Sequence, residues 1–141
     1  MKNMKKRIIS LIVFFIAVSM MMPIAVNAAQ PGTATPRWDN TAMVTCLIGF
    51  QDATNGSAEA HVMGHLTVNK ITADVYVYVE SGTNWNYVAE AHKTVNNCSL
   101  TISCPFTSVS GARYRADYTF VVTKNGVDET ITQTAYRTNP Y

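Results

Sequence analysis

The sequence predicts an all-β protein, a seven-stranded immunoglobulin-like or fibronectin-III-like sandwich with one three-stranded and one four-stranded sheet. Two observations predict this class. From Thr41 onward, apolar and polar residues alternate with a period of two, and no segment has the helical period. Turns rich in Gly and Asn divide this alternation into runs that we expect to be strands near residues 42–50, 57–67, 71–80, 85–92, 98–106, 113–124 and 127–136.

A secretory signal peptide is predicted over residues 1–29. The chain starts with basic residues up to Arg7, continues with an apolar run over 8–22, and then has Pro23 and small residues at Ala28-Ala29, the order typical of a cleaved signal. The alternative is a membrane anchor, because the apolar run is just long enough to span a bilayer. The proline and the small residues favour cleavage, so we expect a secreted, extracellular protein.

The rest of the chain is expected to form one domain. Residues 30–40 are interpreted as a polar tether, and residues 41–141 carry the strands without an internal repeat or a second linker. The signal contains four of the 11 basic residues and none of the nine acidic ones, which leaves seven against nine and a net charge of −2. This charge gives no support for nucleic acid or an anionic membrane as a partner. No membrane association is expected after cleavage.

The first hairpin is predicted at Thr54-Asn55-Gly56. We expect a three-residue loop with Gly56 in the left-handed region, which places Ile48 opposite Val62. The alternation of all strands then predicts the core, which consists of Val44, Ile48, Phe50, Val62, Leu66, Val75, Val77, Val88, Leu100, Ile102, Tyr118, Phe120 and Ile131.

A further hairpin is predicted at Ser81-Gly82-Thr83-Asn84. It places Val77 opposite Val88 on the inner face and Tyr78 opposite Tyr87 on the outer face. Such a hairpin is typical of the four-stranded sheet of fibronectin-like folds.

The last two strands are joined by Asn125-Gly126. This dipeptide favours a two-residue hairpin because both residues tolerate positive φ. The turn sets Phe120 opposite Ile131 on the inner face. At the start of the same hairpin, Tyr114 matches the tyrosine that often caps a corner at the entry to the sixth strand of such folds.

The outer face of the four-stranded sheet is the one candidate binding site that the sequence offers. Tyrosine and arginine are enriched at binding hot spots, although tyrosine also favours strands for packing reasons alone. Arg115 is expected opposite Tyr136, close enough for a cation–π contact. Trp38 and Trp85 are interpreted as core or edge packing. The expected binding residues are Tyr76, Tyr78, Tyr87, Arg113, Arg115 and Tyr136.

The three cysteines leave their pairing open. Cys98 and Cys104 are too far apart along one strand to bond each other. A disulfide of Cys46 with Cys98 or Cys104 requires the first strand to approach the fifth or to cross sheets. The alternative is three small buried hydrophobic residues.

The sequence has no catalytic or metal-binding signature that gives a candidate site. His61 and His65 have the spacing of a zinc helix, but Val62 stands where the general base belongs, and on a strand the two histidines lie about 13 Å apart. No G-x-S-x-G, phosphate-binding glycine loop or C-x-x-C occurs. The sequence therefore predicts no metal site, no cofactor and no enzyme activity.

Several short motifs resemble an uncharacterised group of small signal-bearing proteins of Gram-positive gut bacteria. They are Pro36-Arg37-Trp38, the Gly82…Trp85 turn, Tyr114-Arg115 and the Asn125-Gly126…Glu129-Thr130 hairpin. The resemblance implies the sandwich fold and the bacterial source, and it implies no catalytic residue.

The function expected from these observations is that of a secreted, non-enzymatic module that binds an extracellular protein or a glycan. One alternative is a small secreted enzyme or an enzyme inhibitor. Another is a structural protein of the cell surface.

Overall fold

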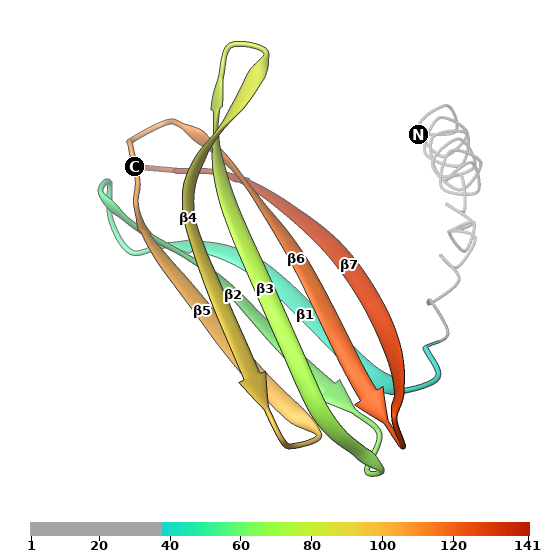
Figure 1. Cartoon of the computed structure of the whole chain (residues 1–141). Helices are drawn as coiled ribbons and strands as arrows, with labels where there is room; N and C mark the ends of the chain where they lie inside the picture. Colours follow the sequence, from blue (N-terminus) through green and yellow to red (C-terminus); the bar gives the residue numbers. More distant parts are fainter. Residues whose placement is uncertain (1–37) are drawn as a thin grey trace, which may run out of the picture. The chain divides into compact units, whose positions relative to one another are not determined.

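Seven antiparallel strands in two sheets form the part of the chain that the structure, a computed structural model, describes, residues 38–141 (Figure 1). The strands are β1 (Thr41–Phe50), β2 (Asn55–Gly64), β3 (Val68–Ser81), β4 (Asn84–Val95), β5 (Ser99–Thr107), β6 (Arg113–Lys124) and β7 (Val127–Thr138). Within residues 38–141 there is no helix that is long and apolar enough to cross a membrane. The predicted signal peptide, and the predicted tether up to residue 37, lie outside the described residues.

The strand order confirms the predicted division into a three-stranded and a four-stranded sheet. The smaller sheet has the order β1-β2-β5 and the larger sheet has the order β4-β3-β6-β7. The two sheets lie face to face in Figure 1. Burial alternates along the strands, so that every second residue of β3 from Ile71 to Val77 is fully buried. The inner faces of the sandwich therefore form one core.

The predicted core is confirmed with one exception. Leu66 is 95% exposed, because β2 ends at Gly64 and Leu66 lies in the turn before β3. Val68 fills the space beside Gly64 instead, where a Cβ would lie 2.7 Å from the nearest valine methyl. Val44, Phe50 and Val88 are half-buried against the core, and the buried members of the predicted set are Ile48, Val62, Val75, Val77, Leu100, Ile102, Tyr118, Phe120 and Ile131.

The hairpin of β6 and β7 has the predicted turn and register. Asn125 and Gly126 both have positive φ, 52° and 76°. Phe120 lies opposite Ile131, and both side chains are buried. The Asn-Gly signal thus fixes the pairing of two strands of twelve residues each.

Tyr114 caps the corner before β6, as predicted. Its hydroxyl oxygen accepts a hydrogen bond of 2.8 Å from the backbone N–H of Val109. The ring is 1% exposed and packs against Phe50 and Phe106, with centroid separations of 5.5 and 5.0 Å. The side chain therefore ties the β5–β6 connection to the core.

The register of the β1–β2 hairpin differs from the prediction. Ile48 lies opposite Ala58, four residues away from the predicted partner Val62. Because the difference is an even number of residues, the same side chains still point inward. This explains why the core prediction survives an error in pairing.

The turn of this hairpin is closed by a side chain rather than by a left-handed glycine. The Asp52 carboxylate accepts hydrogen bonds from the backbone N–H groups of Thr54 (2.8 Å) and Asn55 (2.9 Å) and from the Asn55 amide. Hydrogen bonds from the Asn55 side chain and the Thr54 backbone lower the pKa of Asp52 to about 2. Gly56 has no positive φ and lies in β2, where a Cβ would clash with Phe106 at 2.6 Å.

The hairpin of β3 and β4 contains a β-bulge that the sequence analysis did not predict. Tyr78 lies opposite Tyr87 as expected, but Val77 lies opposite Ala89 instead of Val88. Val88 is the extra residue, and both Val88 and Ala89 pack against the core. The bulge shifts the alternation of β4, so odd-numbered residues point outward before it and even-numbered residues point outward after it.

The last residues of the predicted tether belong to the folded domain. Glu129 of β7 accepts hydrogen bonds from the backbone N–H groups of Asp39 (2.6 Å) and Asn40 (3.2 Å) and from the Thr41 hydroxyl (2.7 Å). Asn40 is 6% exposed, and Trp38 packs against the core. The domain boundary therefore lies at or before Trp38, rather than at Thr41.

Candidate binding face

A row of four large side chains crosses the outer face of the four-stranded sheet. The strand pairings place Tyr87 of β4 beside Tyr78 of β3, Tyr78 beside Arg115 of β6, and Arg115 beside Tyr136 of β7. The two outer tyrosines are 57% and 54% exposed. All four belong to the predicted binding residues, and the structure brings them together.

Arg115 lies at the centre of this row between two aromatic rings. Its guanidinium carbon is 4.6 Å from the Tyr78 ring centroid and 5.1 Å from that of Trp85. One of its Nη groups forms an ion pair of 3.1 Å with Asp117. Its Nε is buried and has no hydrogen-bond acceptor among residues 38–141, which is consistent with a guanidinium that is held mainly by ring faces. The side chain is therefore held in place from three sides.

Arg113 extends the same cluster at the next position along β6. Its guanidinium carbon lies 5.4 Å from the Tyr136 ring centroid, and it forms an ion pair of 3.5 Å with Glu80. The predicted cation–π partner of Tyr136 was Arg115, and this prediction is wrong. The guanidinium of Arg115 lies instead over the rings of Tyr78 in β3 and Trp85 in β4.

Trp85 is the member of the site that the sequence analysis missed. It was assigned to core or edge packing, but it lies beside Glu80 on the outer face and contacts the Tyr136 ring at a centroid distance of 5.8 Å. The signal was present, since Trp85 precedes Tyr87 by two residues and the latter was predicted to face outward. We call the cluster of Tyr78, Trp85, Tyr87, Arg113, Arg115 and Tyr136 the aromatic patch.

Tyr76, the remaining predicted residue, lies one row further along the sheet in a polar environment. Its strand partners are Glu90 and Asp117, and its ring meets that of His92 edge to face at 5.8 Å. It therefore shares the face of the aromatic patch but contacts a different set of side chains.

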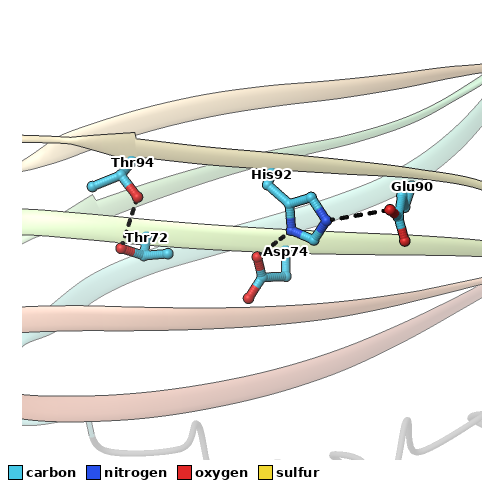
Figure 2. Close-up of polar contacts among 5 residues, drawn as sticks. All are labelled: Thr72, Asp74, Glu90, His92 and Thr94. Carbon is cyan, nitrogen blue, oxygen red and sulfur yellow. Dashed lines mark hydrogen bonds and ion pairs between the residues drawn. The ribbon is translucent and has the colours of Figure 1, made fainter.

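His92, which contacts Tyr76, lies between the carboxylates of Asp74 and Glu90 (Figure 2). Its Nδ1 is 2.6 Å from Asp74, and its Nε2 is 3.7 Å from Glu90. The hydrogen bond to Asp74, together with the negative charges of both carboxylates, raises the pKa of the imidazole above its ordinary value. The next row along the strands is formed by Thr72 and Thr94, whose hydroxyls bond each other at 3.1 Å.

The three cysteines are free thiols in the structure, so neither proposed disulfide of Cys46 is formed. Cys46 lies in β1, Cys104 lies in β5, and Cys98 is the residue directly before β5. Strand β2 lies between β1 and β5 in the sheet. Two strand spacings amount to about 10 Å, beyond the reach of a disulfide. Burial raises the pKa of Cys46 to about 11. Cys104 is buried, whereas Cys46 and Cys98 are half-buried against the core, so the alternative of three small buried hydrophobic residues holds fully for Cys104 alone.

The two histidines of the H-x-x-x-H sequence do not converge. His61 lies on the outer face of β2, where its Nδ1 is 3.0 Å from the Thr101 hydroxyl. His65 lies in the turn after β2, and its backbone N–H donates to Asn40. Among residues 38–141 no group of three or more His, Cys, Asp or Glu side chains is arranged to hold a metal ion.

Comparison with known proteins places the chain in no family. No family model and no curated protein matches it. A protein from Archaeoglobus fulgidus is 11% identical with a TM-score of 0.35, and the match covers 72% of this chain and 98% of that chain. A glycosyl hydrolase family 2 member from Bacteroides cellulosilyticus is 12% identical with a TM-score of 0.36, and the match covers 71% of this chain and 16% of that chain. The sporulation control protein Spo0M from Bacillus subtilis is 10% identical with a TM-score of 0.35, and the match covers 66% of this chain and 47% of that chain.

Similarity at this level says nothing of function. The fold and the site define a class only: a two-sheet, all-β sandwich that carries an aromatic patch on the outer face of its larger sheet.

Proposed function

We propose that this chain is a secreted, non-enzymatic binding module of a Gram-positive bacterium, with an immunoglobulin-like fold, and that it recognises an extracellular protein through the aromatic patch. The observation that carries the proposal is the Tyr87–Tyr78–Arg115–Tyr136 row with Trp85 packed over its arginine.

The residue types of the patch favour a protein partner. Tyrosine, tryptophan and arginine are the residues that most often dominate the binding energy of protein interfaces. Arg115 is already held by Tyr78, Trp85 and Asp117 in the free protein, so little side-chain entropy remains to be lost on binding. Tyr87 and Tyr136 lie at the two ends of the row with about half of their surface free.

The environment of His92 supports a non-enzymatic role for this face. A histidine that activates a nucleophile is bonded to a hydroxyl or thiol through one ring nitrogen. Both ring nitrogens of His92 face carboxylates, Asp74 and Glu90. The arrangement resembles a charge-bearing surface group more than a catalytic dyad.

The test compares the purified protein with two patch variants, Tyr78→Ala and Arg115→Ala, in pull-downs from host and bacterial surface extracts. A protein species that the wild type retains and that both variants lose supports the proposal. Thr132→Ala, an exposed change on the same sheet, is the matched control and should retain the species. Melting temperatures of all variants must remain close to that of the wild type, since the replaced residues lie outside the core.

Two outcomes would contradict the proposal. Equal retention by the wild type and both variants would show that the patch is merely solvated. Retention that survives protease treatment of the extract and is lost on glycosidase treatment would identify a glycan as the ligand of this face.

A further inference from the structure

A groove follows β2 and β5 on the outer face of the other, three-stranded sheet. Its larger hollow has a volume of about 420 Å³, within the range of small-ligand sites. A smaller hollow of about 90 Å³ adjoins it, and Glu59 lines both. The larger hollow is lined mainly by polar side chains, among them Gln51, Ser57, Glu59, Ser103 and Thr107, and the smaller one adds Leu47, His61 and Thr101.

The larger hollow is lined by two small residues that are strand partners, Ser57 of β2 and Pro105 of β5. Gly49 of β1 is the strand partner of Ser57 of β2, and Ser57 is the partner of Pro105 of β5. A Cβ at Gly49 would meet the Ser57 hydroxyl at an ordinary 3.8 Å, so glycine is not required there by crowding. Gly49 lies outside the hollow, while the longer side chains of Gln51 and Glu59 line it together with Ser57 and Pro105.

The chemistry of the groove is that of hydroxyls and one carboxylate. The Ser57 hydroxyl donates a hydrogen bond of 2.8 Å to one Glu59 oxygen, which leaves the second oxygen of that carboxylate to accept from a ligand. Ser103, the strand partner of Glu59, supplies a hydroxyl that both donates and accepts. Glu59 is the one Asp, Glu, Lys or Arg among the residues that line the two hollows.

The backbone of β2 beneath the groove is not available to a ligand, and the unpaired edge of β5 faces away from β2. β2 is the central strand of its sheet and is paired on both sides, with β1 and with β5. A peptide that lies on this surface therefore finds no ladder partners for its N–H and C=O groups. Recognition must come from the side-chain hydroxyls, the Gln51 amide and Glu59, which suit a ligand with closely spaced hydroxyl groups.

We propose that this groove binds a neutral oligosaccharide that lies along β2. Sugar hydroxyls donate to Glu59 and exchange hydrogen bonds with Ser57 and Ser103, while Pro105 and Leu47 offer apolar surface to the sugar rings. The lining of β2 extends from Asn55 to His61, about 20 Å at the rise of a strand. This length accommodates several sugar units. An anionic ligand is disfavoured by the Glu59 carboxylate.

The experiment follows backbone amide resonances of the purified protein during titration with neutral trisaccharides of glucose, mannose and N-acetylglucosamine, to about 10 mM, where a ligand of millimolar affinity is detected. At least one trisaccharide is expected to shift the resonances of residues 57–61 and 101–107. Glu59→Gln should weaken that binding about tenfold, because charge-assisted hydrogen bonds are lost. Ser103→Leu should abolish it by filling the hollow.

Tyr78→Ala on the opposite sheet is the control and should bind the sugar as the wild type does, which separates this site from the aromatic patch. Unshifted resonances outside the groove in both groove variants verify their fold. The proposal is overturned if no neutral trisaccharide shifts the groove resonances, or if the shifts occur at the aromatic patch. The proposal is also overturned if the only sugar that binds is a protonated glucosamine trimer and Glu59→Gln abolishes its binding. The groove would then be a site for cations rather than for neutral sugars.

Discussion

Tyr114→Phe isolates the hydrogen bond that closes the β5–β6 corner. The change removes only the hydroxyl, so the ring remains packed against Phe50 and Phe106. The Val109 N–H, which donates to that hydroxyl at 2.8 Å in a partly buried position, loses its acceptor. A net hydrogen bond contributes about 0.5–1.5 kcal/mol, and an unsatisfied buried donor costs about 1–3 kcal/mol. We therefore expect the free energy of unfolding to fall by about 1–2 kcal/mol.

Urea denaturation followed by circular dichroism measures this loss. For a domain of about 100 residues it corresponds to a fall in melting temperature of about 4–15 °C, with the dependence on urea unchanged. Tyr136→Phe is the matched control, because that tyrosine is 54% exposed on the outer face and its hydroxyl has no hydrogen-bond partner among residues 38–141. Its effect should stay within about 0.5 kcal/mol. If Tyr114→Phe is no more destabilising than Tyr136→Phe, the corner hydrogen bond does not stabilise the fold.

The remaining predictions concern the core, the histidine and the start of the chain. Phe120→Ala should lower the free energy of unfolding by about 3–5 kcal/mol because the ring is fully buried, whereas Thr119→Ala, its outward-facing neighbour, should cost far less; equal losses would refute the register of β6. The pKa of His92, measured by NMR, should be higher in the wild type than in the Asp74→Asn variant. Because the folded state binds this proton more tightly than the unfolded state, protonated His92 stabilises the fold below about pH 6.5, and this stabilisation is lost as pH rises through the folded pKa. A pKa that is unchanged in the variant would contradict the role of that carboxylate. Mass spectrometry of culture supernatant should find a chain that begins at Ala29 or one residue later, and a membrane-retained chain with an intact N-terminus would contradict the signal-peptide prediction.

The sequence was most informative where a turn depends on backbone conformation. Asn125-Gly126 predicts positive φ at two successive residues, and this fixes the pairing of β6 with β7. The loop after β1 depends instead on the Asp52 side chain, which accepts several hydrogen bonds within its own turn. Aspartate occurs in many loops, so its presence did not exclude the glycine-based turn, and the predicted register was wrong by four residues.

Five of the six members of the aromatic patch were predicted, but Trp85 was missed and the ring that contacts Arg115 was predicted wrongly. Alternation and one hairpin were enough to bring Tyr78, Tyr87 and Arg115 to one face. Which ring covers a guanidinium depends on rotamers and on the twist of the sheet, and periodicity carries no information on either. The groove beside Glu59 was not predicted, because its lining residues come from different strands, which only the register brings together.

The bulge at Val88 also has a consequence for how this face can change in evolution. Trp85 and Tyr87 precede it, and Glu90 and His92 follow it, so one inserted residue keeps two out-of-phase segments of β4 on a common surface. Point substitutions alter this surface one side chain at a time. Deletion of Val88 would restore strict alternation and leave Trp85 and Tyr87 on the outside, whereas regular pairing with Val88 retained would turn both rings inward and bring Asn84 and Asn86 to the surface. The aromatic surface therefore tolerates loss of the extra residue, but not a register that absorbs it.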